Sequence, residues 1–165
     1  MGTGKQSMVR CLDMRMLLVF TTICILALPI RASASLGDDV GSVQVDQARM
    51  KGVQRTTRTE LYTVHEIKGS EGTVVREYVS SAGKIFAVAW QGPFLPDLRQ
   101  LLGGYFERFS QGSQARNNNR PRIRGPIQIQ EPGLVVQSGG HMRAYFGRAY
   151  LPDQVPKGVN IEEIR

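Results

Sequence analysis

Residues 84–90 read KIFAVAW, and every residue after the first is apolar. A short apolar run without polar alternation, bounded by turn residues, is typical of a β-strand that is buried on both faces. We therefore expect this strand at the centre of a sheet. Ala87 and Ala89 share one face with Ile85, whereas larger side chains such as Phe86 occupy the other face. The small face is expected to lie directly beneath a helix.

Two further strands are predicted on the N-terminal side of this run. Residues 61–68 (LYTVHEIK) and 73–80 (TVVREYVS) both alternate with the period of two that strands show. Glycine-containing turns at 69–72 and 81–83 join them to each other and to the central strand. The three segments together predict an antiparallel meander.

A helix is expected after the central strand. Apolar residues recur there with the period of one helix face, and they are Leu98, Leu101, Leu102, Tyr105, Phe106 and Phe109. Pro96 and Asp97 suit the start of this helix, and a shorter helix is predicted at 43–50, ending at Gly52. Residues 35–41 are polar and glycine-rich, so we expect a mobile start there.

The C-terminal part of the chain predicts a second set of strands. Residues 126–131 and 134–137 are strand-like, and 142–150 completes a hairpin around the glycines before it. Residues 110–125 (SQGSQARNNNRPRIRG) show no periodicity and are interpreted as a flexible loop rich in Arg and Asn. The fold class is therefore α+β: an antiparallel sheet of five to six strands, in two hairpins or meanders, with one main amphipathic helix packed on it.

The N-terminal segment has the pattern of a secretory signal peptide. A basic stretch precedes an uncharged apolar run at 16–30, and residues 32–34 (ASA) supply an exit of small residues. The run has 15 residues. As a helix it is about 22 Å long, shorter than the ~30 Å hydrocarbon core of a membrane. We predict cleavage between Ala34 and Ser35, and the alternative is a membrane anchor that keeps the segment.

Removal of the signal peptide 1–34 changes the composition of what remains, a single domain at 35–165. The whole chain carries a net charge of +7, but this domain has 17 Lys and Arg against 13 Asp and Glu, or +4. Both cysteines, Cys11 and Cys24, lie in the leader, so the mature chain is cysteine-free. Disulfides, thiol catalysis and thiolate metal sites are thereby excluded for it. An exported domain of modest charge is not expected to bind nucleic acid.

Two histidines, His65 and His141, are the candidates for acid–base chemistry in the domain. A small periplasmic hydrolase would use one of them with Glu66 or Glu77 within hydrogen-bond reach. A metal site would need both histidines to converge with a carboxylate, yet they lie on separate predicted strands without close ligand spacing. No metal and no cofactor are therefore expected.

The segment 139–143 (GGHMR) is the first candidate for binding. Two glycines allow close backbone approach, and a histidine and an arginine follow within three residues. We select His141 and Arg143 as candidate binding residues, with His65 as a third. The simplest interpretation of the segment itself is a hairpin turn. No catalytic residue is assigned.

Several motifs in this domain resemble those of one protein family. They are YTVHEI, GTVVREYVS, GKIFAVAWQGP, LPDLRQLLG, GGHMRA and GRAYLP, in this order, behind a leader that ends near Ala34. The family is a domain of unknown function found in small exported proteins of Gram-negative bacteria. The resemblance covers residues 35–165. It implies an envelope or secreted location and assigns no catalytic or binding residue.

These observations favour a non-enzymatic binding or accessory protein of the cell envelope, either periplasmic or secreted. Its partner is expected to be another envelope protein or a surface component, reached by strand addition at an exposed sheet edge. Membrane contact is expected only through the leader, if that segment stays uncleaved. Two alternatives remain open: the hydrolase described above, and a membrane-anchored structural envelope protein.

Overall fold

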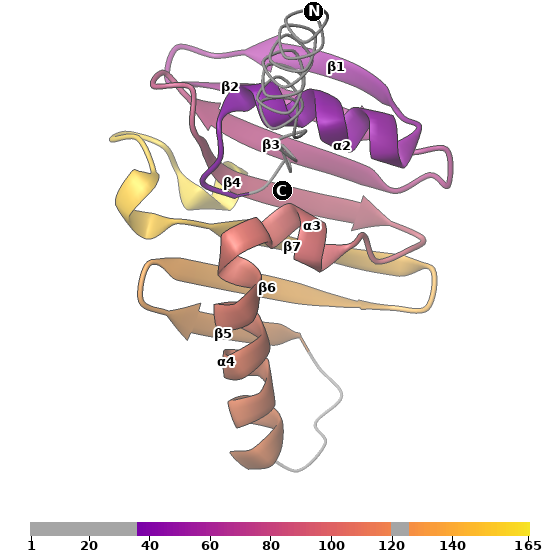
Figure 1. The fold of residues 1–165 in the computed structure, drawn as a ribbon, viewed down its shortest axis with the longest axis vertical. Coiled ribbons are helices and arrows are strands. Elements are labelled where there is room, and N and C mark those ends of the chain that lie inside the picture. Colours follow the sequence, from indigo (N-terminus) through magenta and orange to yellow (C-terminus); the bar gives the residue numbers. More distant parts are fainter. Residues whose placement is uncertain (1–35, 120–125) are drawn as a thin grey trace, which may run out of the picture. The chain divides into compact units, whose positions relative to one another are not determined.

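The computed structural model describes residues 36–119 and 126–165, which belong to one compact unit. Its centre is an antiparallel sheet of seven strands in the order β1-β2-β3-β4-β7-β6-β5 (Figure 1). The strands are β1 (Val53–Arg58), β2 (Tyr62–Lys68), β3 (Val74–Ser80), β4 (Ile85–Gly92), β5 (Ile127–Glu131), β6 (Leu134–His141) and β7 (Ala144–Tyr150). The α+β class and the antiparallel sheet are confirmed, with seven strands in place of the expected five to six. The predicted signal peptide and its cleavage site lie outside the described residues.

The additional strand is β1, at one edge of the sheet. Its sequence, VQRTTR, is exposed along nearly its whole length and shows no apolar alternation. It pairs with β2 alone, from Val53 opposite Lys68 to Arg58 opposite Thr63. Ladder hydrogen bonds and the strand preference of threonine stabilise such an edge strand, and neither leaves a hydrophobic period in the sequence.

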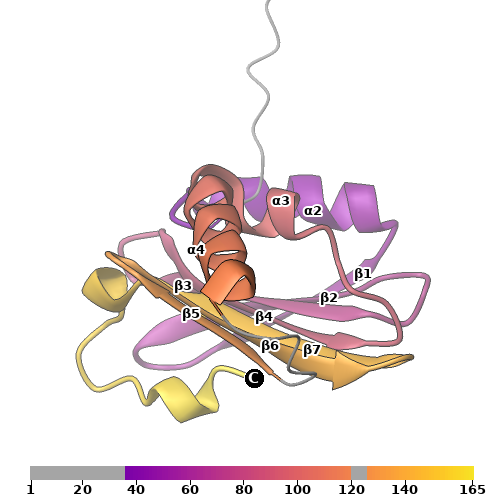
Figure 2. The same cartoon turned by 90° about the horizontal axis from the view of Figure 1, so that it is seen from below.

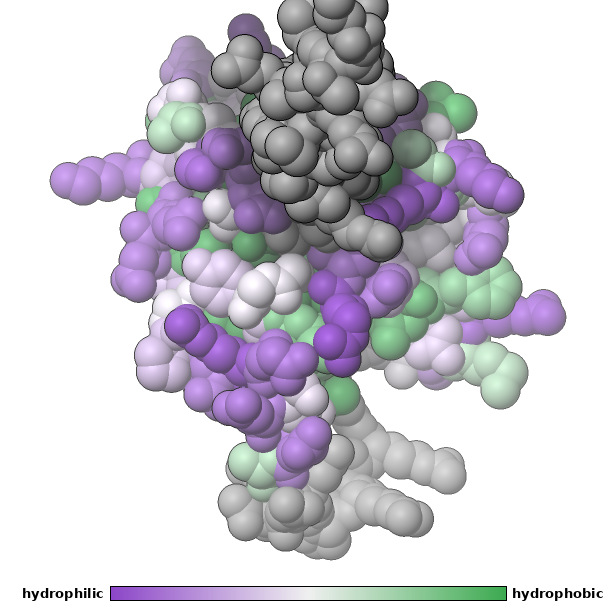
Figure 3. Space-filling model, viewed as in Figure 1, coloured by the Kyte–Doolittle hydropathy of each residue, from purple (hydrophilic) through white to green (hydrophobic). Residues whose placement is uncertain are grey.

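Helices cover one face of the sheet, and the C-terminal segment covers part of the other (Figure 2). The helical elements on the first face are η1 (Val40–Ser42), α2 (Val43–Met50), α3 (Leu98–Leu102), η2 (Gly103–Tyr105) and α4 (Phe106–Asn119). The C-terminal segment, residues 151–165, contains η3 (Pro152–Gln154) and η4 (Ile161–Glu163). Seen from the helix side, hydrophilic side chains make up much of the outer surface of the helices (Figure 3). No helix among the described residues is long and apolar enough to cross a membrane.

Both predicted helices form, and the second is divided. The helix predicted at 43–50 is confirmed as α2. The segment 98–109 begins as expected, with the Asp97 side chain accepting hydrogen bonds from the backbone N–H groups of Arg99 and Gln100. It is then interrupted at Gly103, whose φ of 47° and ψ of −121° lie outside the helical region. The amphipathic stripe is therefore shared by α3, η2 and α4.

Helix α4 extends into the predicted Arg- and Asn-rich loop. It continues to Asn119, so the interpretation of 110–119 as a flexible loop is wrong. The helix packs on β5, and Gly112 permits the close approach, because a Cβ at that position would lie 2.8 Å from a methyl carbon of Ile129. Tertiary packing thus stabilises a stretch without an apolar period of its own. Residues 120–125, the rest of that loop, lie outside the described residues.

A β-bulge in β4 reverses the expected facing of its first residues. Tyr78 of β3 pairs with Ala87, but the next residue, Val79, pairs with Ile85, which leaves Phe86 without a partner in β3. Ile85 therefore joins the core beneath the helices, while Phe86 joins the core on the opposite face beside Ala87. Strict alternation predicts the reverse placement for both residues, and that prediction is wrong.

The prediction that a helix covers the alanine face of β4 is also wrong. The helices cover the large side chains Val88 and Trp90. The alanine face is covered by the C-terminal segment, whose Ile164 is buried in the same core cluster as Ala87 and Ala89. Small side chains at this place leave room for that segment to lie close to the sheet.

The first described residues are bonded to the body of the domain. Leu36 is buried, and its N–H donates to Leu101 O at 2.9 Å. Gly37 N–H donates to Ile85 O at 2.8 Å. The prediction of a mobile start at 35–41 is therefore wrong for the described part of that range.

Candidate functional site: a groove on the face opposite the helices

A row of polar side chains crosses the sheet on the face opposite the helices. Its members are paired from strand to strand in the order Arg55, Glu66, Arg76, Ala89, Arg148, Gln137 and Gln128. The row lies on this face because Ala89 belongs to the core beneath the C-terminal segment, and residues paired directly across strands share a face. Ala89, in the middle, is its one apolar member, and the C-terminal segment is bound there.

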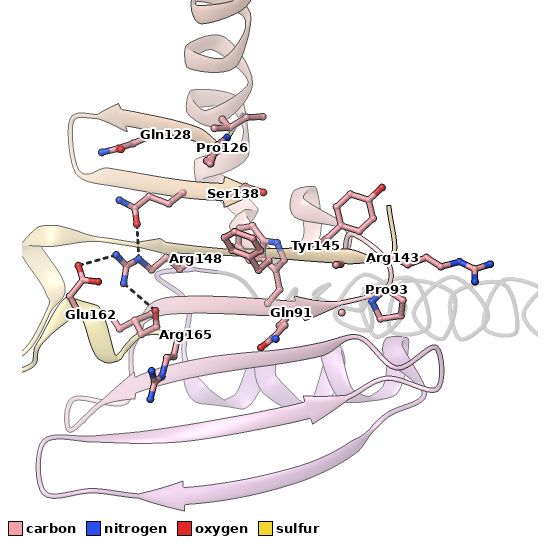
Figure 4. Close-up of a pocket in the computed structure, with 18 residues that line it drawn as sticks. Gln91, Pro93, Pro126, Gln128, Ser138, Arg143, Tyr145, Arg148, Glu162 and Arg165 are labelled. Atoms are coloured by element: carbon pink, nitrogen blue, oxygen red, sulfur yellow. Dashed lines mark hydrogen bonds and ion pairs between the residues drawn. The ribbon is translucent and has the colours of Figure 1, made fainter. Parts of the chain in front are cut away.

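Arg148 of β7 binds the C-terminal segment to the sheet. Its Nη1 donates to the carbonyl oxygens of Ile161 at 2.7 Å and Ile164 at 3.3 Å. Its Nε donates to Gln137 Oε1 at 2.7 Å, and its Nη2 donates to Glu162 Oε1 at 3.2 Å (Figure 4). Only 16% of the Arg148 side chain is exposed. Water therefore competes weakly with these charge-assisted bonds, and they stabilise more than surface ion pairs do.

Arg76 of β3 binds the end of the same segment from the other side of Ala89. Its Nη1 donates to Arg165 O at 3.0 Å, and its Nε donates to Glu66 Oε2 at 2.7 Å. The hydroxyl of Tyr78 donates to Arg165 O at 3.1 Å and accepts from Arg165 N–H at 3.2 Å. Two arginines, one on each strand next to β4, therefore hold the segment over the alanine face.

A groove of about 830 Å³ lies beside this segment, over β4, β7, β6 and β5. Its lining combines amides, guanidinium groups and apolar side chains, among them Gln91, Gln128, Gln137, Arg143, Arg165 and Phe146. Arg143 lies at one end of the groove, and Arg148, Glu162 and Arg165 gather at the other (Figure 4). The groove therefore has charged ends and a middle of mixed polarity.

Phe146 presents an exposed aromatic ring in this groove. The side chain is 54% exposed although it is large and apolar. Phe146 is paired with Gln91 on β4 and with Gly139 on β6. A Cβ on Gly139 would lie 3.0 Å from Phe146 Cζ, so the ring lies over the glycine. The glycine leaves the space that the ring occupies.

A smaller groove of about 520 Å³ adjoins the first. The two grooves share Gln91 and Arg165. The smaller one is lined further by Arg55, Glu66 and Arg76 of the polar row. The C-terminal segment thus has a groove on either side of its last residue.

The two histidines are not brought together. His65 lies on β2 and His141 on β6, and β3, β4 and β7 separate these strands. Four strand spacings of about 4.8 Å place them roughly 19 Å apart, too far to share a metal ion or a reacting group. His65 Nδ1 lies 2.9 Å from Gln54 Nε2 and 3.1 Å from Thr56 Oγ1. Burial lowers the pKa of His65.

Glu77 lies beneath the helices and not in an open site. It is paired with His65 across β2 and β3, but its side chain is buried and bonded to that of Asp46 on α2. Gln100 Nε2 of α3 donates to Asp46 Oδ1. Burial, followed by the hydrogen bond and the charge of Asp46, raises the pKa of Glu77 to about 9. At neutral pH this carboxyl is therefore protonated, shielded from water and unsuited to activate His65.

We expect Glu77 to make stability depend on pH. Its pKa is about 9 in the folded protein against an ordinary 4.5, so between these values the folded protein binds more protons than the unfolded chain. The stabilisation is therefore fully present below about pH 4.5 and is lost as the pH rises toward about 9. Glu77→Gln removes this titration and keeps a donor for Asp46, so its free energy of unfolding is expected to fall less steeply with pH.

Urea unfolding at about pH 5, 7 and 8.5 measures this difference. Glu107→Gln is the matched control, because Glu107 is exposed on α4. The same dependence on pH in Glu77→Gln and in the control would show that the buried carboxyl does not titrate as described.

The candidate residues selected from the sequence lie in different parts of the structure. Arg143 lines the groove. His141 is exposed at the neighbouring turn, and its Nδ1 lies 3.2 Å from Met142 O. His65 lines a separate hollow beside β1 and β2, and Glu66 is bound to Arg76. Among the described residues, no three His, Cys, Asp or Glu side chains lie close enough to hold a metal ion.

Sequence reasoning missed the glutamines of the groove. Gln128 and Gln137 alternate with the apolar residues Ile129 and Val136, which face the helices. That alternation was the available signal, because a polar residue between two core residues must lie on the opposite face. A row of amides on one face becomes visible only once the strand pairing is known.

Comparison with known proteins identifies one family. The family model described as a protein of unknown function (DUF2844) matches residues 32–164. This match spans nearly all of the described residues and confirms the resemblance to a domain of unknown function. No curated protein and no solved structure matches the chain.

Proposed function

The chain belongs to the DUF2844 family, and we propose that it is a non-catalytic binding protein of the cell envelope whose ligand site is the groove opposite the helices. The observation that carries this proposal is the open groove of about 830 Å³, which has charged groups at its two ends (Figure 4) and an exposed aromatic ring in its lining. Ligand sites in proteins are typically concave, partly apolar and supplied with a few placed polar groups.

The charged groups of the groove suit binding rather than reaction. Its lining includes one acidic side chain, Glu162, and that group is paired with Arg148. The remaining polar side chains are mainly amides and guanidinium groups. Arginine stays protonated in proteins and an amide transfers no proton, so neither serves as a general base. Binding is therefore favoured over hydrolysis at this site.

The groove is a better candidate than the edge of the sheet formed by β1. The edge strand β1 carries two arginines, Arg55 and Arg58, and charged side chains on an edge discourage the addition of another strand. The groove, by contrast, has unpaired polar groups and an exposed ring that remain available to a ligand. We therefore propose the groove, rather than the β1 edge, as the contact with an envelope component.

The proposed envelope location rests on the pattern of residues 1–34 and is supported by the start of the domain. A cut between Ala34 and Ser35 keeps Leu36, whose side chain is buried. N-terminal sequencing of the protein from its native host is expected to begin at Ser35. A start at Met1 would instead support the membrane-anchored alternative.

A photo-crosslinking residue in place of Gln128 is expected to capture an envelope component in intact cells of the native host. Gln128 is exposed and lines the groove. The matched control is the same crosslinker in place of Glu107, which is exposed on α4, beyond the opposite face of the sheet. Adducts from position 128 without adducts from position 107 support the proposal. No adduct at 128, or equal labelling at both positions, contradicts it.

A further inference from the structure

We propose that the groove binds an acidic saccharide, a chain of sugar units that carry carboxylates. This inference rests on the proposed binding function and adds the chemistry of the ligand. It is drawn from three features: amide groups without partners, an aromatic ring exposed beside them, and unpaired guanidinium groups at both ends.

The first feature is the supply of free amides. Within the described residues, the side chains of Gln91 and Gln128 have no hydrogen-bond partner, and Gln137 uses only its oxygen, toward Arg148. An amide both donates and accepts, so it matches hydroxyl groups, which do the same. The backbones of β4 and β6, which carry Gln91 and Gln137, are paired on both sides in the sheet. The ligand must therefore present its own polar groups to side chains, as a sugar does.

The second feature is the ring of Phe146. Its position over Gly139 leaves one side of the ring against the strand, and 54% of the side chain is exposed. Aromatic faces carry negative charge density and attract the partly positive hydrogen atoms of C–H groups. A pyranose ring has a face of C–H groups with hydroxyls around its rim, so it fits a ring that is flanked by amides.

The third feature is unpaired positive charge. Arg143 and Arg165 line opposite ends of the groove (Figure 4), and neither guanidinium group forms an ion pair within the described residues. The carboxylate in the groove, Glu162, is already paired with Arg148. A guanidinium group binds a carboxylate through two parallel hydrogen bonds. Carboxylates spaced along a saccharide chain therefore match positive groups that are spaced along the groove.

Other classes of ligand match these features less well. A peptide that adds a strand needs a free edge, which the groove meets only at β5, whereas Gln91, Gln137 and Phe146 lie on strands that are paired on both sides. An acyl chain needs continuous apolar walls, and amides interrupt them here. Nucleic acid binding requires the neutralisation of many phosphates, and within the described part of the chain the groove offers two unpaired arginines, Arg143 and Arg165.

Calorimetric titration of the exported protein with tetragalacturonic acid tests the inference, with maltotetraose as a neutral control of the same length. The acidic saccharide is expected to bind, and more weakly as salt is raised. Phe146→Ala is expected to weaken binding at least about fivefold through the lost ring contact. Arg143→Gln combined with Arg165→Gln is expected to weaken it more than about tenfold.

Arg99→Gln is the control variant for charge, because Arg99 is exposed on α3 at the helix side. It is expected to bind tetragalacturonic acid as the parent protein does. The arginines changed in the groove are exposed, so thermal unfolding of their variant is expected to match the parent. Phe146→Ala also loses the contact of the ring with Gly139, so its binding is measured well below its own unfolding midpoint. A loss of binding therefore reports on the groove and not on folding.

Equal affinity for maltotetraose would overturn the acidic character of the ligand. No binding of tetragalacturonic acid, or binding that the groove variants leave unchanged, would overturn the saccharide assignment. Crosslinking at position 128 does not depend on the class of ligand. Adducts there without saccharide binding would reject this inference and leave the binding function standing, and failure of both experiments would reject both.

Discussion

Gly147→Ala is expected to lower the free energy of unfolding by about 3 kcal/mol or more, because it overpacks a core that cannot relax. A Cβ at position 147 would lie 2.6 Å from Trp90 Cε2 and 2.7 Å from Gln137 O. Trp90 is 2% exposed and packed beneath the helices. The Gln137 backbone is part of the β6–β7 ladder. Urea unfolding followed by far-UV circular dichroism measures the loss in every variant, including those without Trp90.

Gly104→Ala is the control for this substitution. A Cβ at position 104 would have no heavy atom within 4 Å, so the change in stability is expected to stay within about 0.5 kcal/mol. Trp90→Phe added to Gly147→Ala is expected to recover part of the loss, because the smaller ring leaves room for the methyl group. If Gly147→Ala were as stable as the parent, the described packing of Trp90 against β7 would be wrong.

Local patterns predicted most of the strands and the short helix α2. Strands β2, β3 and β4 were predictable because each carries apolar residues in a period that suits its burial, with glycine at the turns between them. Strand β1 was not predictable, since no residue of VQRTTR is buried. The helical part of 110–119 was missed for a related reason: its stability comes from packing on β5, which the sequence does not display.

The groove could not be predicted from local sequence patterns, for a different reason. Gln128, Gln137 and Arg148 are distant in the sequence and become neighbours only through the pairing of β5, β6 and β7. Likewise, the bulge at Phe86 moves Ile85 to the helix side, and no glycine or other turn residue in the strand sequence indicates that bulge. Of the groove, only Arg143 was a candidate from the sequence, because it follows glycines at a visible turn. Sites built across strands depend on register, which a single sequence specifies only weakly.

Arg148→Met is expected to lower the free energy of unfolding by about 3 kcal/mol, since each lost bond to a charged group is worth about 1.5–3 kcal/mol before relaxation. The substitution keeps most of the side-chain length and removes four hydrogen bonds, to Gln137, Ile161, Ile164 and Glu162. Two of the acceptors are backbone carbonyl oxygens of the C-terminal segment. That segment covers the core cluster of Phe86, Ala87 and Ala89, so its release exposes apolar side chains as well.

Hydrogen exchange distinguishes this local effect from a general loss of stability. In Arg148→Met, the amides of Glu163 and Ile164, which are bonded within η4, are expected to exchange faster by a larger factor than those of β2 and β3. Arg99→Met is the control, because Arg99 forms an ion pair with Glu107 in which both side chains are about 70% exposed. Such surface pairs contribute about 0–1 kcal/mol to stability. Equal effects of the two substitutions would mean that Arg148 does not hold the segment. Unchanged exchange at residues 163 and 164 would mean that Arg76 and Tyr78 suffice to bind it to the sheet.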